Sequence, residues 1–372
     1  MKWLFGLLLI VLVGCSTSIE LNSGEIVSQG DFTFEILTDD LQNPWGMSFL
    51  SENKLFITQR TQGLILLNLD TFEKTDILGV PEFISPGQGG LLDVKYYDGY
   101  IYLTYVVEND GAHSTRLGRG IFDKENFEII DFEVLHTSSP AMSGGSHFGS
   151  RILIVDDLIY YTTGDRGRKD FGPDHVSQNT SNTLGALIRL NLDGSIPSDN
   201  PFISNTSVLD EIYTFGHRNP QGMTLNSRTG EIWISDHGEN EGDEINIIKA
   251  GSNYGWPIAH TGCRYGTRIR FAENPFDLEE IENPVYYWEC GTGGFPPAGM
   301  IFYFGERYIE LHGDLLIGNL AGRELGRFSV EGNNVEELSP VFEGQRVRDV
   351  IVSLDDYIYF ITDAGNLIRL MG

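Results

Sequence analysis

The sequence is poor in positive charge. It contains 25 lysine and arginine residues against 53 aspartate and glutamate residues, which gives a net charge of −28. Proteins that bind nucleic acids need a basic face to neutralise phosphates, and the overall field of this chain repels polyanions. Nucleic acid is therefore not an expected partner. Hydrophobic residues make up 41% of the chain and aromatic residues 12%, so the composition is that of a globular protein and not of a disordered one.

Long apolar runs are also scarce, and the clearest one lies at the N-terminus. Residues 4–13 are apolar, follow the positive Met1-Lys2 start, and precede small residues and Cys15. This pattern resembles a bacterial lipoprotein signal and is too short to span a bilayer. We expect residues 1–15 to be the signal, Cys15 to be lipidated and residues 16–30 to form a flexible tether. The protein would then be periplasmic or on the cell surface, with only its lipid in the membrane. A buried core segment is the alternative.

Cysteine is rare, with three residues in the chain. Export to an oxidising compartment would favour a disulfide between Cys263 and Cys290. These two cysteines lack CxxC spacing and neighbouring ligand residues, so they make a poor zinc site. The sequence leaves their pairing open.

Helical periodicity is nearly absent after residue 30, where short alternating strands are separated by Gly, Asn and Asp turns. A pair of apolar strands recurs six times, at residues 46–49 with 54–57, 90–94 with 100–103, 151–155 with 158–161, 222–225 with 231–234, 299–302 with 314–317, and 348–352 with 357–360. A four-stranded sheet cannot bury both faces alone. The repeat therefore predicts an all-β, six-bladed β-propeller of four-stranded antiparallel sheets over residues 31–372. Residues 31–37 should pair beside 367–370 and close the ring. Two β-sandwiches are the alternative.

Common catalytic motifs are missing too. Residues 144–148 begin like a G-x-S-x-G elbow, but Phe148 stands where the last glycine should be. The chain has no H-E-x-x-H zinc motif, no P-loop and no G-x-G-x-x-G that opens a helix. Serine hydrolase, zinc protease and nucleotide-dependent enzyme therefore lose support.

Strong hydrogen-bond donors instead stand just before several predicted strands. They include the segment 216–222 (Gly-His-Arg-Asn-Pro-Gln-Gly), Gln88, and the pair Arg346 and Arg348. Side chains two residues apart on a strand share a face, so both guanidiniums should point the same way. Each arginine alone is interpreted as a surface residue, but together they predict a local region of positive potential that binds an anion.

Two further segments suggest chemistry. Residues 236–244 hold five carboxylates bent by two glycines, and hard oxygen ligands on such a turn suit Ca²⁺, although the register is not that of an EF-hand. A solvated turn is the alternative. His147 is a candidate general base, because imidazole is the commonest one, with a structural histidine as the alternative.

In this order, the segments 147–149, 216–222 and 243–246 followed by 253–257 resemble the soluble quinoprotein glucose dehydrogenases and the aldose sugar dehydrogenases. The resemblance runs from about residue 41 to the C-terminus. Members of this family are six-bladed propellers that use pyrroloquinoline quinone (PQQ) and Ca²⁺. The resemblance implies that an aldose is oxidised at its C1 hydroxyl to a lactone, that hydride passes to PQQ, and that an external electron acceptor follows.

The resemblance also implies residue roles. His147 would be the base, and Arg218 would stabilise charge at the quinone. The residues implied to contact the cofactor are Gln88, Arg218, Asn219, Tyr265, Asn319, Leu320, Ala321, Arg346, Val347 and Arg348. A catalytic Ca²⁺ would use Gly238 and Glu239, and a structural one Glu244 and Tyr254.

The chain departs from the family at two positions. Ala321 replaces a cofactor-binding lysine, so either Arg323 substitutes for that lysine or the affinity for the cofactor is lower. Ser146 replaces an acid, which points to the aldose dehydrogenase branch. A calcium-dependent sugar lactonase and a non-catalytic binding propeller are alternative functions. The joint presence of His147, Gln88 and the arginine pair favours the dehydrogenase, as a monomer or a homodimer.

Overall fold

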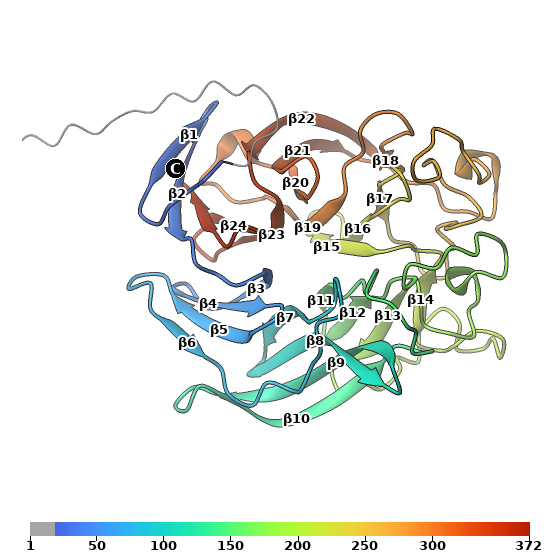
Figure 1. Ribbon diagram of the computed structural model, residues 1–372, viewed down its shortest axis with the longest axis horizontal. Helices are drawn as coiled ribbons and strands as arrows, with labels where there is room; N and C mark the ends of the chain where they lie inside the picture. Colours follow the sequence, from blue (N-terminus) through green and yellow to red (C-terminus); the bar gives the residue numbers. More distant parts are fainter. Residues whose placement is uncertain (1–18) are drawn as a thin grey trace, which may run out of the picture.

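The computed structural model describes residues 19–372, so the predicted signal and Cys15 lie outside the described residues. Six antiparallel sheets surround a common centre (Figure 1). The expectation of an all-β, six-bladed propeller is confirmed, and the six predicted strand pairs form the first two strands of the six blades. Among residues 19–372, no helix is long and apolar enough to cross a membrane.

Five blades consist of four strands that follow one another in the chain. Blade 1 contains β3 (Pro44–Ser51), β4 (Lys54–Gln59), β5 (Gly63–Asn68) and β6 (Lys74–Asp76), and blade 2 contains β7 (Leu91–Tyr97), β8 (Tyr100–Asn109), β9 (Ala112–Asp123) and β10 (Glu128–Thr137). Blade 3 contains β11 (Ile152–Val155), β12 (Leu158–Thr162), β13 (Ala186–Asn191) and β14 (Ile212–Phe215). Blade 4 contains β15 (Pro220–Asn226), β16 (Glu231–Asp236), β17 (Glu244–Ile247) and β18 (Tyr286–Tyr287), and blade 5 contains β19 (Pro297–Phe302), β20 (Leu315–Asn319), β21 (Glu324–Glu331) and β22 (Asn334–Glu343).

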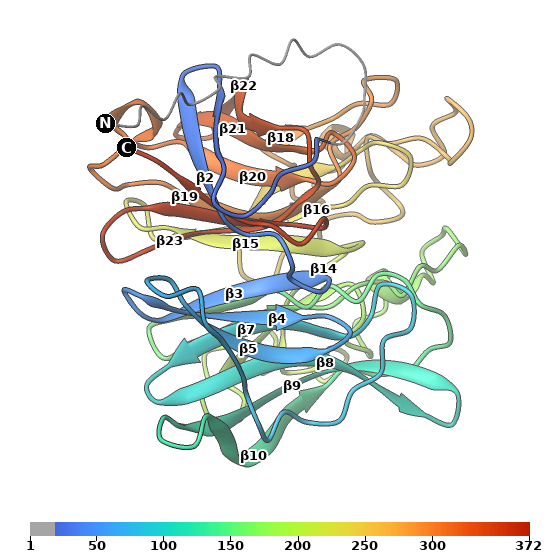
Figure 2. The same cartoon turned by 60° about the vertical axis from the view of Figure 1, so that its left-hand side comes forward.

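Blade 6 joins the two ends of the chain. It contains β23 (Val347–Val352), β24 (Ile358–Thr362), β25 (Leu367–Leu370), β2 (Phe32–Thr38) and β1 (Ile26–Gln29). Strand β2 pairs with β25, with Phe34 opposite Leu370, which confirms the predicted ring closure. The blue strand β2 lies beside the red C-terminal strands in Figures 1 and 2. Three short 3₁₀ helices complete the elements: η1 (Val176–Gln178), η2 (Pro275–Asp277) and η3 (Ile309–Leu311).

Strand β1 corrects the predicted start of the propeller. It lies within the range 16–30 that we expect to be a tether, and it gives blade 6 a fifth strand. Gln29 pairs with Phe32 across a two-residue turn, in which Gly30 has a positive φ of 56°. Glycine adopts this conformation readily, and a Gly-Asp turn between alternating residues favours a hairpin. The folded domain therefore begins before residue 31.

The core is divided into layers between neighbouring blades. Six clusters of buried apolar side chains lie between adjacent blades, one at each of the six interfaces. Between blades 5 and 6, for example, Phe34 packs edge-on against Phe342 and Phe360, with ring centroids 5.4 and 5.9 Å apart. Each sheet thus buries both faces, which is why a single blade cannot stand alone.

A buried ion network joins the inner strands at the axis. Nη1 of Arg151 lies 3.2 Å from Asp93 and 3.0 Å from Asp349, and all three side chains are buried. The other oxygen of Asp349 accepts the Met47 N–H at 3.0 Å, so the network reaches β3, β7, β11 and β23. A β-carbon at Gly46 would lie 2.4 Å from an Asp93 oxygen, so only glycine lets the strands approach this closely.

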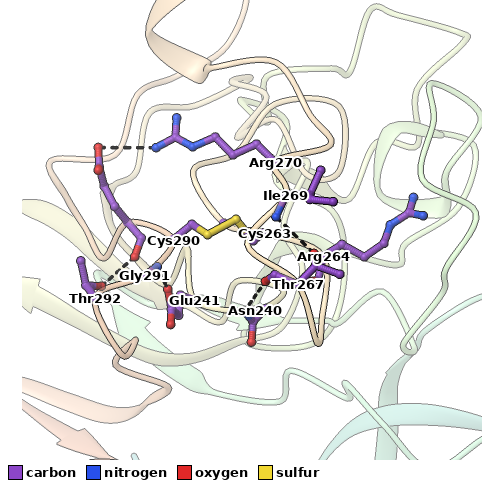
Figure 3. Close-up of a disulfide and its surroundings, with 12 residues drawn as sticks. Asn240, Glu241, Cys263, Arg264, Thr267, Ile269, Arg270, Cys290, Gly291 and Thr292 are labelled. Atoms are coloured by element: carbon purple, nitrogen blue, oxygen red, sulfur yellow. Dashed lines mark hydrogen bonds and ion pairs between the residues drawn. A yellow bond between two sulfur atoms is a disulfide. The ribbon is translucent and has the colours of Figure 1, made fainter.

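One disulfide links two long loops of blade 4. Cys263 and Cys290 are bonded, with Cα atoms 5.5 Å apart (Figure 3). Asn240 and Cys263 exchange backbone hydrogen bonds of 2.9 and 3.1 Å, and Glu241 accepts the N–H groups of Gly291 and Gly293. The disulfide therefore joins the loop after β17 to the loop after β18, and hydrogen bonds from both loops hold the acidic turn after β16.

Candidate active site

A cavity of about 300 Å³ lies at one end of the propeller axis. Its lining comes largely from residues that precede or begin inner strands, because those strand starts converge at this end. The lining residues are Asn43, Pro44, Trp45, Arg60, Gly87, Gln88, Asn219, Gln221, His237, Leu320, Arg346, Arg348 and Asp363. Five of them, Gln88, Asn219, Leu320, Arg346 and Arg348, are predicted cofactor residues. A larger cavity of about 1000 Å³ between blades 1 and 2 is lined by none of the predicted site residues.

Guanidinium groups dominate this axial cavity. Nε of Arg346 and Nε of Arg348 lie 2.7 and 2.9 Å from the two oxygens of Asp363, so the predicted pair does share one face. Burial raises the pKa of Asp363, but the two arginines outweigh it and hold that pKa below its ordinary value. Arg60 also lines the cavity and donates to the Gly89 carbonyl at 3.0 Å. Three guanidiniums face one carboxylate, and this surplus of positive charge suits an anion with several carboxylates.

His147 lies beside this cavity in a tightly constrained loop. Its backbone N–H donates to Gln88 Oε1 at 2.8 Å, and its φ of 52° is in the left-handed region. A β-carbon at Gly164 would lie 2.2 Å from the His147 carbonyl oxygen, so the neighbouring loop packs directly on its backbone. The imidazole is 12% exposed, and its Nδ1 lies 2.6 Å from Asp165 Oδ1.

Asp165 orients this imidazole. It is fully buried, and it also accepts the Gly167 N–H at 2.7 Å and Trp256 Nε1–H at 2.8 Å. Burial raises the pKa of Asp165, but the hydrogen bond and charge of His147 outweigh this effect and hold the pKa below its usual value. A carboxylate at Nδ1 accepts a hydrogen bond from the ring N–H, so the proton of the neutral imidazole stays on Nδ1 and Nε2 keeps a free lone pair to accept a proton. The role of Asp165 is not predictable from the sequence, because no spacing pattern links it to a histidine 18 residues away.

Arg218 belongs to the same region and lies just before β15, the first strand of blade 4. It is buried, and its Nη2 lies 2.8 Å from Glu239, whose carboxylate also binds Lys169 at 2.7 Å. Its guanidinium lies 5.1 Å from the centre of the Trp256 ring. The side chain of Glu239, predicted to serve a metal through its turn, is therefore held by two cations. Burial and the charges of Arg218, His147 and Arg348 keep the pKa of His237 well below its usual value, so this cavity histidine is neutral.

The other predicted cofactor residues do not line the axial cavity. Val347 is fully buried in the core between blades 5 and 6, because it is the strand residue between two outward arginines. Asn319 binds Glu324 and the Gly322 N–H, and Ala321 is exposed at the same turn. Arg323, the proposed substitute for the missing lysine, is not a lining residue. Tyr265 is 58% exposed, with Lys169 Nζ 5.1 Å from its ring centre.

The acidic turn ends at a buried carboxyl group that suits a cation. Glu244 is buried, and burial together with Asp236 raises its pKa to about 8. The Glu244 carboxyl group accepts a hydrogen bond from the Asn246 amide at 3.3 Å, and Asn246 Oδ1 has no hydrogen-bond partner. The Tyr254 hydroxyl is occupied by Ile247 and Lys249, so only its backbone oxygen could serve as a ligand. Within residues 19–372, no three His, Cys, Asp or Glu side chains cluster as a metal site, so Ca²⁺ would depend on carbonyl oxygens.

Fold and site together define a six-bladed propeller protein with an arginine-lined axial cavity beside an aspartate-oriented histidine. The sequence model of the glucose/sorbosone dehydrogenase family matches residues 41–369, and the chain belongs to this family. It is 34% identical to the aldose sugar dehydrogenase YliI of Escherichia coli, over 90% of this chain and 92% of that protein. It is 32% identical to quinoprotein glucose dehydrogenase B of Acinetobacter calcoaceticus, over 91% of this chain and 87% of that protein. The apo crystal structure of the soluble E. coli aldose sugar dehydrogenase superimposes with a TM-score of 0.85 at 34% identity, covering 91% of this chain and 99% of that one.

Proposed function

We propose that this protein oxidises the C1 hydroxyl of an aldose to the lactone, with PQQ and Ca²⁺ as cofactors. The observation that carries this proposal is the pair of His147 and Asp165 beside a cavity rich in guanidinium groups. The named activity of the E. coli relative and the word quinoprotein in the name of the Acinetobacter relative support it. An external electron acceptor would complete the cycle.

The residues of the cavity fit the proposed cofactor. PQQ carries three carboxylates, and Arg60, Arg346 and Arg348 present a surplus of positive charge over Asp363. Bound PQQ would supply an electrophilic quinone that accepts the C1 hydride. His147 Nε2 would take the proton of the C1 hydroxyl, while Asp165 holds the ring and stabilises the imidazolium that forms. Arg218 would stabilise the negative charge that develops at the quinone as the hydride arrives.

Reconstitution tests this proposal. Purified protein incubated with PQQ and Ca²⁺ should reduce a dye acceptor when an aldose is added, and protein without PQQ should not. Hydrolysis of an added sugar lactone, with no dye signal from any aldose, would instead favour the lactonase. PQQ or sugar binding without turnover would favour the non-catalytic propeller and would contradict the proposal.

We expect Glu244→Gln to abolish the stabilisation that Ca²⁺ gives. In metal-free protein the folded pKa of about 8 exceeds the ordinary value of 4.5, so the folded state holds a proton that the unfolded state loses. Stability therefore falls as pH rises from about 4.5 to about 8, by on the order of 4 kcal/mol. Ca²⁺ replaces this proton, so the difference in Tm between Ca²⁺-loaded and EDTA-treated protein should widen over that range.

Differential scanning calorimetry measures both effects. Glu324→Gln is the matched control, because Glu324 is a partly buried glutamate that, like Glu244, accepts a hydrogen bond from an asparagine amide, at 2.8 Å. The Glu324→Gln variant should keep the difference in Tm between Ca²⁺-loaded and EDTA-treated protein. An equal Ca²⁺ effect in Glu244→Gln and in the unmodified protein would remove Glu244 from the metal site.

We also propose that the protein is exported and anchored to the membrane by a lipid on Cys15. Cys15→Ala should shift the protein from the membrane fraction to the soluble fraction of cells, because cleavage and acylation at a lipobox need this cysteine. Immunoblots of fractionated cells measure the shift. Unchanged fractionation would contradict the anchor while leaving the catalytic proposal untouched.

A further inference from the structure

A second cavity, of about 510 Å³, adjoins His147. It is lined by Ser143, Gly144, Gly145, Ser146, Arg166, Gly167, Arg168, Lys169 and Asp170. Ser146 directly precedes His147, and a β-carbon at Gly167 would lie 3.9 Å from His147 Nδ1. Because the His147 N–H binds Gln88 of the axial cavity, His147 stands between lining residues of the two cavities. A substrate in the second cavity would thus lie close to the loop that carries His147 and close to the proposed cofactor site.

The lining of this second cavity is cationic. Arg166, Arg168 and Lys169 face a single lining carboxylate, that of Asp170, in a chain whose net charge is −28. At physiological ionic strength, exposed charges are screened beyond about 8 Å, so the nearby cations decide which ligand binds there. The remaining lining residues are glycine and serine, which offer a sugar no apolar surface.

The cations are only partly neutralised by the protein. Arg166 is buried and donates to the carbonyls of Ser146 and Gly144 at 2.6 and 2.9 Å. Its Nε has no hydrogen-bond partner, and its guanidinium lies 3.4 Å from the centre of the Phe148 ring. Lys169 shares Glu239 with Arg218, so two cations use one carboxylate. Arg168 pairs with Asp170 at 3.0 Å, and both are close to half exposed.

We propose that this cavity selects acidic sugars, and that the preferred substrates are uronic acids. The inference rests on the proposed dehydrogenase function and adds the substrate class. The cationic groups at 166–169 hold the C6 carboxylate, while the C1 hydroxyl faces His147. The C1 hydrogen leaves as hydride to the quinone, the hydroxyl proton goes to His147, and the carboxylate is unchanged. The product is the lactone of an aldaric acid.

Paired substrates test the inference on protein loaded with PQQ and Ca²⁺. We expect kcat/KM for D-glucuronate to exceed that for D-glucose by about tenfold at low salt, the size of one charge-assisted hydrogen bond. The ratio of the two kcat/KM values should shrink in 0.5 M salt, because the Debye length there is about 4 Å and the salt screens the cations. Arg168→Gln should lower this ratio about fivefold. Lys124→Gln is the control, because it removes the same charge at the turn between β9 and β10, at the other end of blade 2 from Gln88.

Binding without turnover separates this inference from the proposed function. Methyl β-D-glucuronide has no free C1 hydroxyl and should bind about five times more tightly by calorimetry than methyl β-D-glucoside. If no aldose is oxidised but this glucuronide preference holds, the dehydrogenase proposal fails and the acidic-sugar site stands. If neutral sugars are oxidised as well as uronates, or if Arg168→Gln leaves the ratio unchanged, the inference is overturned.

Discussion

His147→Gln should lower kcat for aldose oxidation by roughly 10²–10⁴-fold, the usual contribution of a general base. The imidazole Nε2 is the group that Asp165 leaves free to accept the hydroxyl proton, and a glutamine amide cannot take that proton. Affinity for PQQ should change little, because the arginines of the axial cavity remain. The single-turnover rate of PQQ reduction in the loaded variant measures the effect directly.

A second histidine provides the matched control. His136 has the same exposure as His147, 12%, but lies between blades 2 and 3, where it contacts Tyr161 and Glu211. His136→Gln should change thermal stability and leave the rate per loaded molecule near that of the unmodified protein. A rate within about threefold of the unmodified protein for His147→Gln would mean that another group is the base.

Asp165→Asn should lower kcat by a comparable amount, roughly 10²–10⁴-fold, although Asp165 does not touch the sugar. An asparagine amide turned toward Nδ1 leaves the ring proton on Nε2, so the imidazole loses its free lone pair on the substrate side. The indole bond from Trp256 can persist on the amide oxygen, because Trp256 binds the carboxylate oxygen that does not face Nδ1, whereas the Gly167 N–H loses its acceptor. We therefore expect KM and the PQQ dissociation constant to stay within a few-fold, so that the loss falls on kcat.

The control for this variant is Asp314→Asn. Asp314 is another buried aspartate, bound to Arg327 at 2.6 Å, but it precedes β20 at the opposite end of blade 5 from Asn319. The Asp314→Asn variant should have lower thermal stability and an unchanged kcat. A C1-deuterated aldose adds a second readout, because a larger isotope effect in Asp165→Asn would show that the chemical step has become slower. Equal loss of PQQ affinity and kcat would instead indicate a collapsed site.

Much of the architecture is predictable from local patterns. Strand pairs repeat with turn residues between them, and each apolar strand needs a partner sheet on both faces, so the number of blades and the closing strand β2 follow from the sequence. Strand β1 is different, because Ile26 is exposed and the strand has no apolar alternation to reveal it. Its position depends on edge pairing with β2.

For the site, the sequence alone determined that the residues preceding the inner strands lie close together, because a propeller brings all such positions to one end of its axis. Gln88, Asn219, Arg346 and Arg348 reach the axial cavity for this reason. Only the tertiary structure decided the partners that come from other loops. Asp165 meets His147 and Trp256 across 18 and 91 residues, and Asp363 meets its arginines through the β23–β24 pairing. Contacts between loops depend on how the blades orient them in space, and no periodicity in the chain records that orientation.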